Sequence, residues 1–507
     1  MAESSPINSE RSDQPDTRER QLAALDLGSN SFHLLVAQES NGRLQVVDRI
    51  KEMVRLAEGI EANKSLNPEV VARALDCLVR FSQRLRGLAP EDIRVVGTST
   101  LRRASNANAF LDEAERILGT EVEIISGREE ARLIYLGVSH ALEDTSDRRL
   151  VVDIGGGSTE LILGRRFRAE VMESLHMGCV GMTKRCFGDG RLRMGQFKAA
   201  INIARQELEP LERPFTEAGW DLAIGASGTI LAVQDILAQL SPGTTSPITL
   251  EGLKTIRKVL IDAKQIDKIS LPGLPGERAP VFAGGLSILI GIFESLNIRE
   301  MHATSGALRE GLIYDLLGRV QHQDVRESTV QSLINRYHID ATHARHVRET
   351  AISLLAQIAT AWELTEPSDK LLLSWAADLH EIGMDIAHSQ YHKHGGYLLL
   401  NMDMPGFSRQ DQHFLAALVR THRRKLPPEE FELSERILRL AVLLRISVVL
   451  HRGRTSDPLP HVQLKVKEKK IHLEVPAGWL SHHPLTELDL AQESSYLKAV
   501  GYDLTTS

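Results

Sequence analysis

The feature that most constrains this chain is residues 151–163, where an aspartate, three glycines and a second carboxylate lie between two apolar runs. Side chains that alternate after the glycines predict strand, turn and strand, rather than a turn that opens a helix. Backbone N–H groups of such a turn form a concavity that binds phosphate. The expected phosphate-binding residues are Gly155, Gly156, Gly157 and Ser158. The alternative is a tight hairpin without a ligand, although one glycine suffices for most hairpins.

The same pattern occurs earlier, in residues 24–36, and aligns with the later copy without a gap. Asp26 aligns with Asp153, and the turn residues expected to bind phosphate are Gly28, Ser29 and Asn30, together with Asp26. Two hairpins of one design predict two similar halves. The order of residues also excludes a Walker loop and a dinucleotide-binding fingerprint, because strand residues follow the glycines.

Carboxylates frame the second hairpin. Asp153 precedes its glycines and Glu160 lies on the returning strand. Mg²⁺ usually reaches a protein through one or two carboxylates plus substrate phosphates. We therefore expect Asp153 and Glu160 to be the metal-side residues.

A third carboxylate, Glu130, lies on the helix expected to cross from the first half to the second. Ser126 and Glu129 have the spacing of a capping box, which gives Glu129 a structural role. Glu130 instead shares a helix face with apolar residues and is expected to have no structural partner. It is the candidate base that orients water. The alternative is an acid favoured by the helix dipole in the first turn.

Composition sets the outer bounds. The chain has 507 residues, 42% of them hydrophobic, which allows several cores. A net charge of -7 argues against a nucleic-acid binder or a basic membrane-surface protein. The 3 cysteines lack zinc-type spacing, which favours a reducing compartment. Residues 1–20 are polar, and no stretch approaches the ~18 apolar residues of a membrane span. We expect a soluble cytoplasmic protein with no transmembrane segment.

The order of elements predicts an α/β fold of two actin-like, ribonuclease-H-type domains. A disordered tail at 1–20 should precede domain I at 21–134 and domain II at 135–316. In domain II a strand delivers a small-residue turn to a helix N-terminus, where Gly225, Ser227, Gly228 and Thr229 are candidate phosphate ligands. Helices are expected at residues 68–85, 108–118, 194–211, 281–296 and 440–453.

Beyond residue 316 the composition changes, and 15 of the 19 histidines lie there. Residues 375–383 resemble the core motif of the HD metal-dependent phosphohydrolase domain, so an all-helical HD-like domain is expected at 317–457. Glu381 replaces the Asp of that motif, and Val448 and His451 stand where later acidic ligands would be expected. The substitutions argue against a working metal centre there. Alternating residues after 460 predict a small β-containing cap at 458–507.

Together these motifs resemble the exopolyphosphatase / guanosine pentaphosphate phosphohydrolase family, and they follow the family order over nearly the whole chain. The resemblance rests on residues 26–33, 97–102, 126–133, 155–160, 225–229 and 306–311. It implies dependence on Mg²⁺, stimulation by K⁺ and a homodimer. It also implies that Glu130 is catalytic, that Arg102 is a phosphate ligand, and that Asp153 and Glu160 lie beside the metal.

Within that family, the segment 392–394 and the length of the helical domain favour an exopolyphosphatase, which removes terminal phosphate processively from inorganic polyphosphate. The alternative in the same class is hydrolysis of the 5′ terminal phosphate of guanosine pentaphosphate (pppGpp). From other classes, the alternatives are a nucleotide-switched chaperone or filament module and a sugar kinase. The expected location is the cytoplasm, with peripheral attachment to the inner membrane as the alternative.

Overall fold

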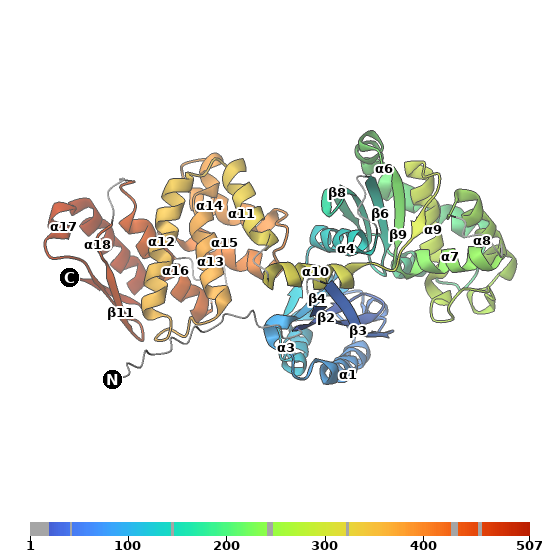
Figure 1. The fold of residues 1–507 in the computed structure, drawn as a ribbon, viewed down its shortest axis with the longest axis horizontal. Helices are drawn as coiled ribbons and strands as arrows, with labels where there is room; N and C mark the ends of the chain where they lie inside the picture. The colour runs from blue at the N-terminus through green and yellow to red at the C-terminus, as the bar shows by residue number, and fades with distance from the viewer. Residues whose placement is uncertain are drawn as a thin grey trace, which may run out of the picture.

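The computed structural model describes residues 20–40, 43–142, 147–240, 247–320, 324–426, 434–454 and 459–507. The expected disordered tail lies outside these residues except for Arg20, which begins the first strand. The molecule is elongated, with two α/β halves at one end and a helical domain at the other (Figure 1). Helix α10 (Leu308–Val320) lies between the two halves and leads to the helical domain (Figure 1).

The first half is built on a five-stranded sheet in the order β3-β2-β1-β4-β5. Strands β1 to β3 form an antiparallel meander, and β4 and β5 add in parallel. Leu78 and Phe81 of α1 are buried in the core of this half. The elements are β1 (Arg20–Leu27), β2 (Phe32–Ser40), β3 (Arg43–Glu52), α1 (Pro68–Leu85), β4 (Ile93–Gly97), α2 (Ser99–Arg103), α3 (Ala107–Leu118) and β5 (Val122–Ile124).

The second half repeats this design in a five-stranded sheet, read from its other edge as β8-β7-β6-β9-β10. The elements are β6 (Arg148–Ile154), β7 (Thr159–Arg165), β8 (Arg168–Leu175), α5 (Cys179–Cys186), α6 (Met194–Ala218), β9 (Leu222–Ala226), α7 (Ser227–Leu240), α8 (Leu250–Ala263), α9 (Ala279–Leu296) and β10 (His302–Ala303).

The register shows how closely the two halves correspond. Asp26 pairs with His33 across β1 and β2, and Asp153 pairs with Glu160 across β6 and β7. The residues aligned in the sequence therefore occupy equivalent places in the two sheets. The predicted duplication of an actin-like α/β unit is confirmed.

Two helices join the halves. Helix α4 (Gly127–Ala141) and α10 contribute to one apolar cluster together with residues of both sheets. Their backbones approach closely: a Cβ at Gly137 would lie 2.0 Å from the Ala307 carbonyl oxygen, and one at Gly311 would lie 1.8 Å from that of Leu133. Only glycine fits at such contacts. This close packing fixes α4, and with it Glu130, between the halves.

Helix α9 is long and apolar enough to cross a membrane by length and composition, with 78% of its apolar window buried inside the protein. Its residues Phe282, Ile288 and Leu289 belong to the core of the second half. The helix is therefore accounted for by packing inside the domain.

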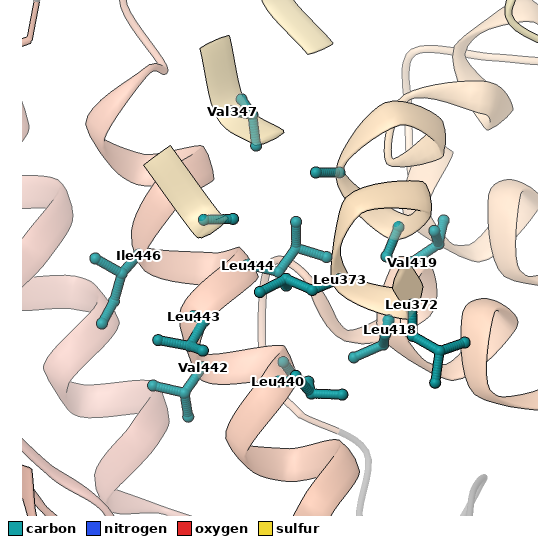
Figure 2. Packing of buried hydrophobic residues seen from close by; sticks show 14 of the residues in the cluster. Val347, Leu372, Leu373, Leu418, Val419, Leu440, Val442, Leu443, Leu444 and Ile446 are labelled. Atoms are coloured by element: carbon teal, nitrogen blue, oxygen red, sulfur yellow. The ribbon is translucent and has the colours of Figure 1, made fainter. Parts of the chain in front are cut away.

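The helical domain has its own core, in which leucines and valines from four helices meet (Figure 2). Val347 comes from α12, Leu373 from α13, Val419 from α15 and Leu444 from α16. The helices are α11 (Val325–Arg336), α12 (Ala341–Ile358), α13 (Pro367–Leu379), α14 (Tyr391–Asn401), α15 (Arg409–Thr421) and α16 (Glu435–Leu450).

The C-terminal segment packs on this domain and shares its core, since Leu464, Leu473 and Leu497 belong to the same cluster of buried residues. It contains a three-stranded sheet in the order β11-β12-β13. The elements are β11 (Gln463–Lys467), β12 (Lys470–Glu474), α17 (Trp479–His482), α18 (Pro484–Lys498) and β13 (Asp503–Thr506).

Polar contacts attach the helical domain to the first half. The Gln410 side chain accepts a hydrogen bond from Ile124 N–H at 3.1 Å and donates one to the Val122 carbonyl at 3.0 Å. The Glu129 carboxylate, one residue from Glu130, accepts a hydrogen bond from Gly406 N–H at 2.9 Å. The helical domain therefore touches the helix that carries the candidate base.

Candidate active site

The two glycine hairpins meet around a cavity of about 370 Å³ between the halves. Helix α4, the start of α7 and the loop before α10 complete its wall. Most of the residues predicted from the sequence line it: Asp26, Gly28, Ser29, Asn30, Glu130, Asp153, Gly155, Gly156, Gly157, Ser158, Glu160, Ser227 and Gly228.

The hairpin turns touch each other directly. A Cβ on Gly156 would lie 3.1 Å from the Ser29 Cβ and 3.2 Å from the Asn30 Cβ, and one on Gly157 would lie 2.9 Å from the Ser99 Oγ. Ser29 is held in turn by the Thr100 hydroxyl, which donates to Ser29 Oγ at 2.8 Å. The glycines thus allow the two turns to face one cavity from opposite sides.

Buried carboxylates give this cavity its electrostatic character. Burial, followed by repulsion from Glu130, raises the pKa of Asp26 to about 8 and the pKa of Asp153 to about 7. The same causes raise the pKa of Glu160 well above its usual range. Burial and neighbouring negative charge favour the neutral form of these carboxylates. A bound cation would stabilise their anionic form.

The cavity also offers a free ligand atom for such a cation. Asp26 Oδ1 is buried and has no hydrogen-bond partner among the described residues. Glu160 accepts from the Ser174 hydroxyl at 2.8 Å, which orients its carboxylate. Asp26, Asp153 and Glu160 line the same cavity, although among the described residues their oxygens do not gather within 4.8 Å of one another. A hard divalent ion would therefore be held by one or two of these carboxylates and by water and phosphate oxygens.

Glu130 is buried at the start of α4, and the structure corrects the expectation that it has no structural partner. Arg102 Nη1 donates to Glu130 Oε2 at 2.8 Å and to the Ile125 carbonyl at 2.9 Å. The N-cap was predicted correctly in part: Ser126 Oγ accepts from Glu129 N–H, whereas the Glu129 carboxylate binds Arg132 and Gly406 N–H. Arg102, expected to bind phosphate, is outside the cavity lining and orients Glu130.

The N-terminus of α7 supplies a further anion site. Ser227 adopts a left-handed backbone with φ 84°, which is strained for a residue with a Cβ. Its hydroxyl is buried without a hydrogen-bond partner among the described residues. A strained residue with an unpaired hydroxyl at a helix N-terminus is suited to bind a phosphate oxygen.

Two residues expected at this turn lie elsewhere. Gly225 belongs to β9, where a Cβ would lie 2.4 Å from the Ile230 Cγ2, so the glycine is required for packing. Thr229 is buried, and its side chain lies against Gly285 of α9. Neither residue is part of the cavity lining. Gly225 still belongs to the strand before the turn, and Thr229 already belongs to the helix after it.

Cationic side chains that were not predicted also line the cavity. They are Lys51, Arg278 and Arg309. Arg309 contacts the His33 Nδ1, and His33 Nε2 lies 2.8 Å from the Ser31 hydroxyl, so a short chain of polar groups orients Arg309. Arg278 covers the backbone of Gly228. No local sequence signal marks Arg278, whereas Arg309 belongs to one of the motifs on which the family resemblance rests.

Taken together, the cavity can hold a phosphate chain between two sets of backbone N–H groups, with cations at its rim. Glu130 can orient a water molecule beside that chain, and buried carboxylates can hold a metal ion. This arrangement suits hydrolysis of a phosphoanhydride bond.

Family models agree with this chemistry. The model of the Ppx/GppA phosphatase family matches residues 35–320, and that of Ppx/GppA phosphatase domain III matches residues 325–494. The chain is 42% identical to the guanosine-5′-triphosphate,3′-diphosphate pyrophosphatases of Photobacterium profundum and Vibrio cholerae. The first alignment covers 485 residues and the second 489, and each spans 95% of this chain and 97% of the relative.

Solved structures are similar over more than half of the chain. The exopolyphosphatase of Cytophaga hutchinsonii is 25% identical, has a TM-score of 0.54, and covers 59% of this chain and 98% of its own. The Aquifex aeolicus PPX-GPPA enzyme, 24% identical with a TM-score of 0.50, covers 58% and 98% and shares the fold. With both family models matched in order along its length, the chain belongs to the Ppx/GppA phosphatases and is a hydrolase of phosphoanhydride bonds.

Proposed function

We propose that the protein removes the terminal 5′ phosphate of guanosine pentaphosphate. The observation that carries this proposal is the 42% identity, over 95% of the chain, to pyrophosphatases named for that nucleotide. Because the alignment includes the helical domain, it covers regions on which substrate choice can depend. This substrate was the alternative in the sequence analysis, and the relatives favour it over polyphosphate.

In the proposed reaction, the two hairpins bind the phosphate chain through their backbone N–H groups, and Ser227 binds a further phosphate oxygen. Glu130 orients a water molecule in line with the phosphoanhydride bond that breaks, and accepts a proton from that water. Arg102 keeps the Glu130 carboxylate in position. Arg309, oriented by His33, adds positive charge beside the phosphate oxygens.

One or two of the carboxylates Asp26, Asp153 and Glu160 would hold Mg²⁺ at this site. The ion would neutralise charge on the phosphate oxygens when bound. Stimulation by K⁺ and a homodimeric assembly stay predictions from the resemblance. The cytoplasmic location, with its membrane-peripheral alternative, stays a prediction from the sequence.

Inorganic polyphosphate is the second candidate substrate. One solved relative is named an exopolyphosphatase, and its similarity covers 59% of this chain. In the helical domain, His392 lies in a cationic neighbourhood: burial, then Arg420, Arg423, Lys393 and Arg424, lowers the pKa of His392 to about 4. Concentrated positive charge outside the catalytic cavity suits a polymer that carries a charge on every unit.

The test is phosphate release from pppGpp, long polyphosphate and ATP, measured in parallel at equal Mg²⁺. We expect kcat/KM for pppGpp to exceed that for polyphosphate expressed per chain end. A higher value for polyphosphate would reverse the order of the two candidates. Transfer of phosphate to an added sugar, without free phosphate, would instead indicate a kinase.

A further inference from the structure

The histidine-rich helical domain contains a side-chain cluster that the hydrolytic site does not use. His343 of α12, His380 at the end of α13 and the adjacent Glu381 each offer one ligand atom, and these atoms all lie within 4.8 Å of one another. All three residues are buried. Nε2 of His343 and Nε2 of His380 are both 3.9 Å from Glu381 Oε1.

The imidazole of His380 is prepared to act as an acceptor. Its Nδ1 lies 2.7 Å from the Ala377 carbonyl, so Nδ1 carries the proton and Nε2 carries the lone pair. This Nε2 is buried and has no hydrogen-bond partner among the described residues, and the residue is 0% exposed. A buried acceptor without a donor is unfavourable unless something binds it.

A second histidine repeats this arrangement next to the first. His422 Nδ1 lies 2.6 Å from the Val419 carbonyl, and its Nε2 is also buried without a partner in the described part of the chain. The rings of His380 and His422 are 5.4 Å apart. Metal-binding histidines characteristically donate their other ring N–H to a carbonyl or carboxylate, which orients the lone pair toward the ion.

From this geometry we propose that His343, His380 and Glu381 form a binding site for a divalent transition-metal ion, separate from the catalytic cavity. Two imidazoles and one carboxylate suit Zn²⁺, Mn²⁺ or Fe²⁺ better than Mg²⁺, which prefers oxygen ligands. Ligand atoms around tetrahedral Zn²⁺ are about 3.4 Å apart, whereas the two histidine nitrogens are 3.9 Å from Glu381 Oε1 and all three atoms lie within 4.8 Å, so side-chain rotations must bring them closer around the ion.

This proposal reverses the expectation drawn from the sequence. The replacement of Asp by Glu381 and the absence of acids at Val448 and His451 argued against a metal centre. In the structure Glu381 Oε1 nevertheless lies 3.9 Å from Nε2 of both histidines. His451 instead contacts the Thr350 hydroxyl at 2.7 Å.

Arg454 is the competitor for this site. Its guanidinium binds Glu381, and it also lies 3.3 Å from Asp340. The Arg454 side chain is 41% exposed, so it can leave Glu381 and remain hydrated. Metal binding then exchanges one cation on Glu381 for another. Removing Arg454 should therefore tighten metal binding. If the Arg454–Glu381 pair had only a structural role, its removal would not change the affinity for zinc.

The experiment uses the full-length chain, freed of metal with a chelator and titrated with Zn²⁺ against a fluorescent zinc indicator. We expect one zinc per chain for this site, at least ~10-fold weaker binding for Glu381→Gln and His343→Ala, and tighter binding for Arg454→Gln. The control is His346→Ala, on the same helix, with its ring 5.9 Å from that of His451 and outside the ligand group. Circular dichroism would establish that each variant is folded.

Co²⁺ in place of Zn²⁺ gives an independent readout, because nitrogen ligands in a tetrahedral site produce strong visible absorption bands. The bands should appear in the wild-type chain and in His346→Ala and disappear in His343→Ala. Equal zinc binding in the wild type and in Glu381→Gln would overturn the proposal. So would an absence of zinc binding at micromolar free zinc, or no gain in affinity for Arg454→Gln.

Discussion

Arg102 Nη1 lies 2.8 Å from Glu130 Oε2, and the same guanidinium nitrogen lies 2.9 Å from the Ile125 carbonyl. Arg102 comes from the short α2 and Glu130 from the first turn of α4, so the contact joins two elements that follow neighbouring strands. Both side chains are largely buried, at 13% and 10% exposed. The candidate base is thus oriented by a partner 28 residues away in sequence.

Glu130→Gln should leave the protein folded and nearly inactive. Glutamine keeps the shape and a bond to Arg102 but cannot accept a proton from water, and loss of a general base costs on the order of 10² to 10⁴ in rate. The measurement is phosphate release, with substrate binding determined separately. The control is Glu113→Gln. It also removes a carboxylate that pairs with an arginine, Arg116, but this pair lies on an exposed helix face. Near-normal turnover in Glu130→Gln would contradict the assignment.

Arg102→Gln should lower kcat because Glu130 loses its orientation. If Arg102 acts through Glu130, the double variant Arg102→Gln/Glu130→Gln should be no slower than Glu130→Gln alone. A steady-state comparison of the single and double variants decides this. An additional large rise in KM in the double variant would instead support direct contact of Arg102 with phosphate, as the family resemblance implies.

Mg²⁺ affinity should rise between pH 6 and pH 8. The pKa values of Asp26 and Asp153 are raised from 3.8 to about 8 and about 7, so the metal must displace protons below those values. These two carboxyl groups hold more protons in the folded chain than in the unfolded chain in this window, so their own contribution to the stability of the metal-free protein should fall as pH rises. Thermal unfolding at both pH values, with and without Mg²⁺, tests this. A pH-independent Mg²⁺ effect would argue against these ligands.

Ser227 allows strain and binding to be separated. Ser227→Gly removes the strain of the left-handed backbone, whereas Ser227→Ala keeps that strain. The strain is worth about 1–3 kcal/mol, from which the entropy cost of ordering a glycine must be subtracted. Both variants lose the hydroxyl, so both should raise KM, while only the glycine variant should match or exceed the melting temperature of the wild type. If neither change alters KM, the hydroxyl does not contact substrate.

Asp315→Asn should destabilise the protein strongly. The buried Asp315 binds Arg94 at 2.6 Å, Arg319 at 3.2 Å and also Arg132, which pairs with Glu129. Breaking such a buried pair costs about 3–5 kcal/mol, because its partners remain charged.

Acidification should act on the same network. The three arginines, acting against burial, hold the pKa of Asp315 well below its usual range. Its contribution is therefore complete above the unfolded pKa of 3.8 and is lost as pH falls below that value. Calorimetry on Asp315→Asn and on the control Asp489→Asn, whose side chain is 26% exposed and pairs with Arg452, would show the difference. Similar melting temperatures for the two variants would contradict this account.

The sequence alone determined the local elements and their duplication. Alternating apolar residues and glycines predicted both hairpins, because turn geometry and strand period are local properties. Helix α1 begins at Pro68 and ends at Leu85, as predicted from its spacing. Helix α6 was predicted to end at residue 211, near its prolines, but it continues to Ala218 because burial of Phe215 compensates for the lost backbone donors.

Only the tertiary structure decided which side chains meet. The residues predicted around the hairpins share one cavity because two sheets of equal order face each other across α4 and α10. Arg278 on Gly228, Arg102 on Glu130 and Glu381 beside His343 come from segments far apart in the chain. Such contacts depend on how whole domains pack, and residue spacing along one segment carries no information about them.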